Sequence, residues 1–173
     1  GAALKRQDRL VKEARLKLGG KWAKLIPSIP PGSNYLWHTK EGGGKPIFKW
    51  RSRYWSFLLK LSPHKPSWTV QASPGSATGP FHWDNRKLDL HELAALQTFP
   101  SEYYFSGSYT AGIRQIGNAV PSAIGELFGK VIRKQVLQHR VTYSLSLIPK
   151  PRTSNVRAAK VRPVAKQYLG LQK

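Results

Sequence analysis

The chain has 173 residues and carries 29 lysines and arginines against 8 aspartates and glutamates, a formal net charge of +21. A hydrophobic content of 40% excludes a chain disordered throughout, and the charge indicates a polyanionic partner, because neutralised phosphates release condensed counterions. The absence of cysteine excludes disulfides and thiolate–zinc sites, and no apolar run is long enough to cross a membrane, so we expect a cytoplasmic protein without a bound metal.

The first expected element is an amphipathic helix between residues 4 and 18. Its apolar positions are spaced for one helix face: Leu10, Val11, Ala14 and Leu18. The other face is strongly basic, and Gly19 and Gly20 supply a stop. Both a solvated helix and a surface that contacts the DNA backbone fit this pattern.

Residues 26–44 are rich in proline and glycine, which indicates loops. Residues 47–61 alternate aromatic and basic side chains, which predicts one or two strands. Such a mixture fits a nucleic-acid surface, since cations hold phosphates and rings stack on bases or sugars. It also fits rings in a core with solvated cations at its edge. By charge and position, Lys45, Arg51 and Arg53 are candidate DNA contacts.

A short strand is expected over residues 68–72, closed by a turn-forming Ser-Pro-Gly-Ser run. The next element is a helix over residues 88–97. Asp89 as its N-cap and Glu92 three residues later form the reciprocal pattern of a capping box, and Pro100 ends the segment.

The clearest helix is predicted from Pro121 to Leu137, because proline suits a first helical turn and the apolar residues recur every three or four positions. Beyond Glu126 the chain has no acidic residue. From Pro149 onward, proline, polar residues and like charges predict a flexible basic tail.

Three segments in order carry a resemblance to a known family: Lys-Pro-Ser-Trp-Thr-Val-Gln-Ala at 65–72, Leu-Gln-Thr-Phe-Pro at 96–100 and Arg-Gln-Ile-Gly-Asn-Ala-Val-Pro at 114–121. From about Lys21 to Leu137 the chain resembles the distal half of a bacterial DNA cytosine-5 methyltransferase. The resemblance implies an α+β fold: a small mixed target-recognition domain of short strands and loops, and a C-terminal helix that would complete a Rossmann-like methyltransferase domain.

The implied organisation has four parts. A basic amphipathic helix spans 1–20, the target-recognition domain 21–87, the closing region of the methyltransferase domain 88–138, and a basic, flexible tail 139–173.

The family transfers a methyl group from S-adenosylmethionine to C5 of a flipped cytosine after a cysteine of a Pro-Cys loop attacks C6. This chain has no cysteine, and the family's Glu-Asn-Val block and glycine-rich cofactor turn are also missing. We therefore expect the chain to be inactive without an N-terminal catalytic half, its expected partner besides double-stranded DNA.

By the same resemblance, Asn118, Ala119 and Val120 are the candidate cofactor contacts. Gly117 permits close backbone approach, and an asparagine beside a helix start offers a donor and an acceptor. A turn residue that satisfies its own backbone is the alternative for Asn118. The resemblance also implies that the apolar face of the last helix belongs against the catalytic domain and is exposed in this chain alone.

Thr69 stands where the family's recognition domain has a threonine beside the target site, which implies a contact to a phosphate or sugar. Gln71 and Ser73 are the other leading DNA contacts. Gln71 has the donor and acceptor geometry for an adenine edge, although a phosphate contact and a solvated strand residue are alternatives.

The resemblance places the chain in a prokaryotic restriction-modification system, in the cytoplasm and bound to DNA of the nucleoid. A stand-alone DNA-binding module without catalysis is the alternative. A basic RNA-binding protein also fits the charge, but it leaves the three ordered segments unexplained.

Overall fold

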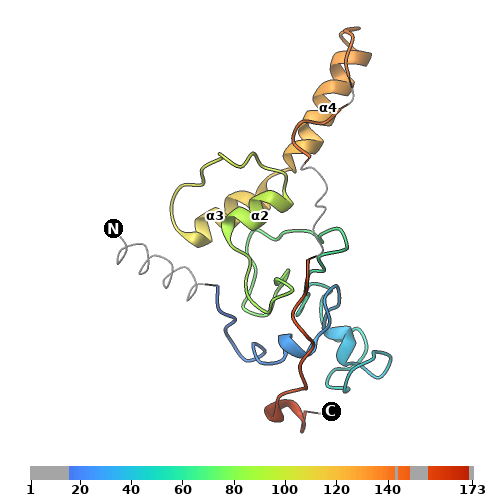
Figure 1. Ribbon diagram of the computed structural model, residues 1–173, viewed down its shortest axis with the longest axis vertical. Helices are drawn as coiled ribbons and strands as arrows, with labels where there is room; N and C mark the ends of the chain where they lie inside the picture. The colour runs from blue at the N-terminus through green and yellow to red at the C-terminus, as the bar shows by residue number, and fades with distance from the viewer. Residues whose placement is uncertain (1–15, 143, 149–155, 172–173) are drawn as a thin grey trace. The chain divides into compact units, whose positions relative to one another are not determined.

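The computed structural model describes residues 16–142, 144–148 and 156–171 (Figure 1). The described residues contain the α-helices α2 (Leu90–Leu96), α3 (Tyr109–Asn118) and α4 (Ser122–Gln135), and the 3-10 helices η1 (Ile26–Ser28), η2 (Tyr35–His38) and η3 (Lys166–Tyr168). The helix expected between residues 4 and 18 falls largely outside the described residues.

The chain divides into two compact units. Unit 1 comprises Gly1–Thr69, Pro74–Leu88 and Val156–Lys173, and unit 2 comprises Val70–Ser73 and Asp89–Asn155. The chain thus passes from unit 1 into unit 2 twice and returns for its last segment.

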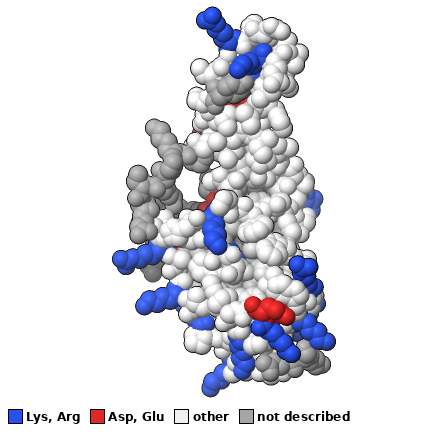
Figure 2. Space-filling model, turned by 90° about the vertical axis from the view of Figure 1, so that its right-hand side faces the viewer, with Lys and Arg blue, Asp and Glu red and all other residues white. Residues whose placement is uncertain are grey.

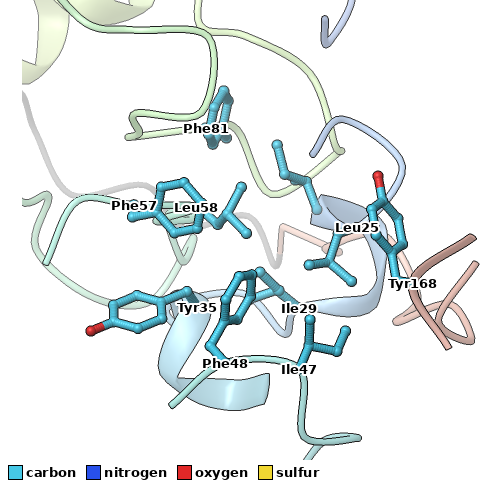
Figure 3. Packing of buried hydrophobic residues seen from close by; sticks show 10 residues of the cluster. Leu25, Ile29, Tyr35, Ile47, Phe48, Phe57, Leu58, Phe81 and Tyr168 are labelled. Atoms are coloured by element: carbon cyan, nitrogen blue, oxygen red, sulfur yellow. The ribbon is translucent and has the colours of Figure 1, made fainter. Parts of the chain in front are cut away.

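A hydrophobic cluster, rich in aromatic rings, forms the core of unit 1 (Figure 3). Its fully buried members include Leu25, Ile26, Ile29 and Leu58. Tyr168 of η3 joins this core: its ring stacks on Trp22 with the ring centroids 5.7 Å apart, and its hydroxyl donates to the Lys21 carbonyl. The C-terminal segment from residue 156 to 171 is therefore packed into unit 1, which differs from the flexible tail expected there; residues 143, 149–155 and 172–173 of that expected tail lie outside the described residues.

The β-pairing within the described residues is confined to two isolated bridges, Phe57 with Thr78 and Lys60 with Phe81. The strands expected within 47–61 and over 68–72 are absent from the structure. In 47–61 the backbone gives the reason: Arg51 and Leu58 have φ angles of 51° and 55°, and this left-handed backbone interrupts an extended run. Unit 1 is therefore built from loops and short helical turns around its core.

Buried polar side chains tie these loops together. His38 of η2 lies 2.8 Å from the Ser28 hydroxyl through Nε2 and 2.9 Å from the Lys45 carbonyl through Nδ1, and burial lowers its pKa. Lys60 is 1% exposed and donates to the Ile29 carbonyl and to Asn85 Oδ1. Burial lowers the pKa of Lys60 to about 8.

Unit 2 begins with the capping box that the sequence predicts. Asp89 accepts from the Glu92 amide, and the Glu92 carboxylate accepts from the Asp89 amide, both at 2.8 Å. Helix α3, which the sequence analysis does not anticipate, is capped by Ser108 and packs on α2. The close approach requires Gly112, because a Cβ there would overlap the Leu90 side chain.

Candidate DNA and cofactor surfaces

The two sequence blocks at 96–100 and 114–121 meet in unit 2. The Gln97 side-chain amide donates to the carbonyls of Ile116 and Ala119 at 3.1 and 3.2 Å, and the Gln97 carbonyl accepts from the Ser122 amide. Thr98, with φ 55°, accepts from the Ala123 amide through its hydroxyl. The end of α2 therefore fixes both the end of α3 and the start of α4.

The candidate cofactor residues lie in the connection that this junction holds. Asn118 ends α3, Ala119 is its C-cap, and Val120 precedes Pro121 at the start of α4. Asn118 is exposed and Val120 is 66% exposed, so an amide side chain and a short backbone segment face outward. The donor and acceptor chemistry of the Asn118 amide fits a zwitterionic amino-acid group.

Gly117 brings one DNA-contact candidate segment to this junction. A Cβ at Gly117 would overlap the backbone of Ala72, so the segment Val70–Ser73 lies directly against the last turn of α3. Val70 is buried, whereas Gln71 and Ser73 are exposed. Unit 2 thus places Gln71 close to Asn118. Thr69 is exposed and belongs to unit 1.

Along its polar side, helix α4 contacts the described residues that follow it in the chain. Glu126 accepts from the amide and hydroxyl of Ser146 and from the Leu147 amide, and it pairs with Lys130 at 2.8 Å. These interactions lower the pKa of Glu126 to about 2. The chain after α4 folds back along the helix in this way (Figure 1).

The apolar side of α4 is uncovered in the structure. Its exposed residues have exposed fractions from 37% to 69%: Ile124, Leu127, Phe128, Ile132 and Val136. We call this surface the apolar stripe. Its exposure agrees with the sequence-based expectation for this helix, and α4 makes no helix–helix contact with α2 or α3.

In unit 1, residues 49–55 form a continuously exposed stretch, which we call the aromatic loop. The Ser52 amide donates to the Lys49 carbonyl, closing a turn with Trp50 and Arg51 at its centre. Trp50, Tyr54 and Trp55 are about half exposed, whereas Phe48 and Phe57 are buried. The core interpretation is therefore confirmed for Phe48 and Phe57, whereas the rings of Trp50, Tyr54 and Trp55 lie on the surface and a DNA contact there stays a prediction.

Two buried side chains hold the aromatic loop in place. Asn34 donates to the Trp55 carbonyl at 2.8 Å. Tyr35 donates through its hydroxyl to the Arg53 carbonyl at 2.6 Å and accepts from the Arg53 amide at 3.2 Å. Lys45 is exposed on a different loop, next to the glycines that pack around Trp37.

Positive charge is concentrated in unit 1. Among its described residues the acidic side chains are Glu41 and Asp84, against sixteen lysines and arginines. The described part of unit 2 is nearly balanced, with four acidic and five basic side chains. Figure 2 shows one face of the molecule, on which lysines and arginines protrude at many places and acidic residues at few.

Within residues 16–142, 144–148 and 156–171, no group of three or more His, Cys, Asp or Glu side chains is arranged to hold a metal ion. No helix in the same ranges has the length and hydrophobicity of a bilayer-crossing segment.

Known proteins similar to this chain are DNA methyltransferases. The type II methyltransferase M.SacI of Streptomyces achromogenes is 44% identical over 136 residues, which cover 73% of this chain and 35% of that protein. The DNA (cytosine-5-)-methyltransferase M.ApeKI of Aeropyrum pernix is 44% identical over 101 residues, 54% of this chain and 19% of that protein. The type II methyltransferase M.AquIB of Picosynechococcus is 34% identical over 110 residues, 57% of this chain and 77% of that protein.

The chain spans about a third of the length of M.SacI. No solved structure matches it. A model of the C-5 cytosine-specific DNA methylase family matches residues 8–134, nearly three quarters of the chain. The chain therefore belongs to the C-5 cytosine-specific DNA methylase family.

Proposed function

We propose that the chain is the C-terminal part of a DNA (cytosine-5-)-methyltransferase, in which unit 1 recognises DNA and unit 2 closes the methyltransferase domain. The observation that carries the proposal is the apolar stripe of α4. A helix of a self-contained domain buries its apolar side and leaves its polar side in water. In α4 the polar side has an intramolecular partner and the apolar side is exposed, as expected where a second part of the enzyme docks.

The junction beside the stripe supports a role in the cofactor pocket. Gln97 and Thr98 fix the connection that carries Asn118, Ala119 and Val120, so these residues are pre-organised rather than ordered by binding. S-adenosylmethionine supplies the methyl group when bound. The Asn118 amide and the backbone at Ala119 and Val120 would hold its amino-acid end, and docking of the stripe would bring them to the remaining walls of a Rossmann-like domain.

The charge distribution supports DNA recognition by unit 1. Its cations greatly outnumber Glu41 and Asp84, so the electrostatic attraction to a duplex acts on this unit more than on unit 2. Arg51, Arg53, Lys45 and Thr69 are exposed in unit 1 and remain the proposed contacts there. Gln71 and Ser73, exposed in unit 2 beside α3, are proposed contacts near the closing junction.

The comparison with M.AquIB is consistent with a chain of this kind that acts with a separate partner. The aligned segment makes up 77% of that relative, so most of that protein corresponds to this part of the family. In this chain the missing cysteine means that the covalent step must come from another part of the enzyme. The alternative function, a DNA-binding module without catalysis, shares unit 1 but gives the apolar stripe no role.

The two functions are separated by reconstitution. The full chain is mixed with a separately expressed N-terminal catalytic half that carries the Pro-Cys loop, and methyl incorporation into DNA from labelled S-adenosylmethionine is measured. We expect methyl transfer from the mixture and none from either part alone or from a catalytic half with its cysteine changed to serine. A stable complex that never methylates DNA would support the module instead.

A further inference from the structure

The aromatic loop presents three large, partly exposed rings on the surface of unit 1. Trp50, Tyr54 and Trp55 are 47%, 54% and 51% exposed. In a B-form duplex the faces of the bases are covered by stacking, and only their edges are open to a protein. An exposed indole face can therefore stack only on a base that has left the helical stack.

Two hollows of unit 1 meet at these rings. The first, of about 530 Å³, is lined by Tyr35, Leu36, Trp50, Arg51, Arg53 and Trp55. The second, of about 300 Å³, shares Leu36, Trp50 and Trp55, and the residues it adds include Trp37 and Glu41. Both volumes are in the range of small-molecule sites, about 300–1,000 Å³.

The rings and cations around the hollows are held in position. The Arg51 guanidinium lies 5.8 Å from the centroid of the Trp50 ring, and Trp55 packs on Trp68 with the ring centroids 5.1 Å apart. Arg51 has φ 51°, the left-handed position of its turn, which a side chain adopts only under local constraint. Asn34 and Tyr35 fix the backbone at Trp55 and Arg53.

We propose that the aromatic loop binds an unpaired base within duplex DNA, with the base in the hollows lined by Trp50 and Trp55 and its flanking phosphates at Arg51 and Arg53. The proposal rests on the role in DNA recognition proposed for unit 1. The first hollow is lined by Arg51 and Arg53 without an acidic residue, which favours the anionic DNA backbone there, whereas the lining of the second hollow includes Glu41. Enzymes that act on a base extrude it from the duplex, so an unpaired partner base arises during the reaction.

The test uses the full chain and three fluorescently labelled DNAs of one sequence. The first is a matched duplex, the second carries an abasic site opposite a 2-aminopurine, and the third is the single strand. We expect the abasic duplex to bind about tenfold more tightly than the matched duplex, because one stacked base is gained. We also expect 2-aminopurine fluorescence to be quenched as the base stacks on tryptophan.

Trp50→Ala and Trp55→Ala should abolish both the preference and the quenching while matched-duplex affinity stays within about twofold, since they remove stacking and keep the cations. Trp50→Phe and Trp55→Phe keep a ring for stacking and should retain the preference for the abasic duplex. Tyr104→Ala is the matched control, because Tyr104 is an 82% exposed ring in unit 2, and it should change neither.

The outcomes separate this inference from the function on which it rests. Absence of any duplex binding by the wild-type chain would overturn both. Duplex binding without preference or quenching would overturn the base site alone. If the single strand binds as tightly as the abasic duplex or more tightly, the site belongs to single-stranded DNA and the proposal is overturned. If the tryptophan variants weaken only the complex with the catalytic half, the loop belongs to a protein interface and the proposal is also overturned.

Discussion

At the scale of single residues, a substitution of Arg51 should affect stability and DNA binding differently. Its left-handed backbone costs about 1–3 kcal/mol for a residue with a Cβ, more than the extra entropy of about 0.5–1 kcal/mol that a glycine loses on folding. We therefore expect Arg51→Gly to unfold at the same urea concentration as the wild type or a higher one. If Arg51 contacts a phosphate, the same variant binds DNA more weakly, and the slope of log affinity against log salt falls by about one.

Arg51→Lys is the control for that prediction, because it keeps the charge and the backbone strain and should retain most of the affinity. Fluorescence anisotropy across a salt series measures both quantities. An Arg51→Gly chain with unchanged affinity and slope would remove Arg51 from the DNA contacts.

Gly117 offers a second test at this scale. An alanine there would overlap the backbone of Ala72, so α3 and the segment Val70–Ser73 must separate. We expect Gly117→Ala to lower the free energy of unfolding by about 1–3 kcal/mol, as for an overpacked contact, and to reduce reconstituted methyl transfer. Gly125→Ala in α4 is the matched control: its Cβ meets open space, and it should raise stability by about 1 kcal/mol. Equal stability of the two variants would contradict the contact at Gly117.

Lys60 predicts a pH dependence. Its partners are the neutral oxygens of Ile29 and Asn85, and burial lowers its pKa from 10.5 to about 8. Between these two values the unfolded chain holds a proton that the folded chain has lost, so stability rises with pH, by up to about 1.4 kcal/mol per pH unit. In urea unfolding at pH 8, 9 and 10, the free energy of unfolding of the wild type should increase with pH relative to that of Lys60→Met. If the free energies of the two chains change with pH in parallel, the lowered pKa is refuted.

At the scale of elements, α4 carries the proposed docking surface. Phe128 is 61% exposed, so Phe128→Gln should leave the melting temperature of the chain nearly unchanged. Because docking would bury the ring, the same change should weaken association with the catalytic half at least tenfold, as expected for the loss of a buried aromatic anchor. Arg133→Gln, on the opposite side of α4, should leave association and reconstituted methyl transfer intact. Equal effects of the two variants would argue against the stripe.

The elements also show where the sequence is informative. The capping box at Asp89 and Glu92 and the helix after Pro121 were predictable, because local hydrogen bonds and apolar spacing determine them. Helix α3 was not, because Gly107, Gly112 and Gly117 resemble helix breakers in a sequence, whereas Gly112 and Gly117 serve close packing on Leu90 and Ala72. The strand prediction for 47–61 failed because the tertiary structure holds Arg51 and Leu58 in left-handed backbone that the alternation of side chains does not reveal.

The candidate site was likewise predictable from the sequence only in part. The sequence blocks marked Asn118, Ala119 and Val120 as candidate cofactor contacts, which stays a prediction, and the structure shows that Gln97 holds the connection on which they lie. The sequence also marked the aromatic and basic stretch. It did not separate the buried rings of Phe48 and Phe57 from the exposed rings of Trp50 and Trp55, because that distinction depends on contacts with residues far away in the chain.

At the scale of the whole molecule, the path of the chain makes the core of unit 1 depend on the C-terminal segment. Tyr168 fills the core of unit 1 against Trp22 and donates to the Lys21 carbonyl across 147 positions of sequence. The Arg162 amide donates to the Pro27 carbonyl in the same unit. The C-terminal basic residues are therefore part of a folded surface, and their charges add to those of the rest of unit 1 at fixed positions.

Loss of the Tyr168 side chain from this core gives the last prediction. Tyr168→Ala should lower the free energy of unfolding by about 3–5 kcal/mol, as for other aromatic truncations in a core, and Tyr168→Phe by about 1 kcal/mol for the lost hydrogen bond. Tyr104→Ala is the matched control for an aromatic truncation, because Tyr104 is 82% exposed in unit 2, and it should leave the unfolding midpoint unchanged. Denaturant unfolding followed by tryptophan fluorescence measures the three, since Trp22 reports on the contact. If Tyr168→Ala unfolds at the wild-type midpoint, the C-terminal segment does not contribute to the core. If Tyr168→Ala unfolds at a lower denaturant concentration, DNA binding should be lost at that same concentration. The reason is that the proposed contacts at Arg51 and Arg53 are held by residues that pack on this core.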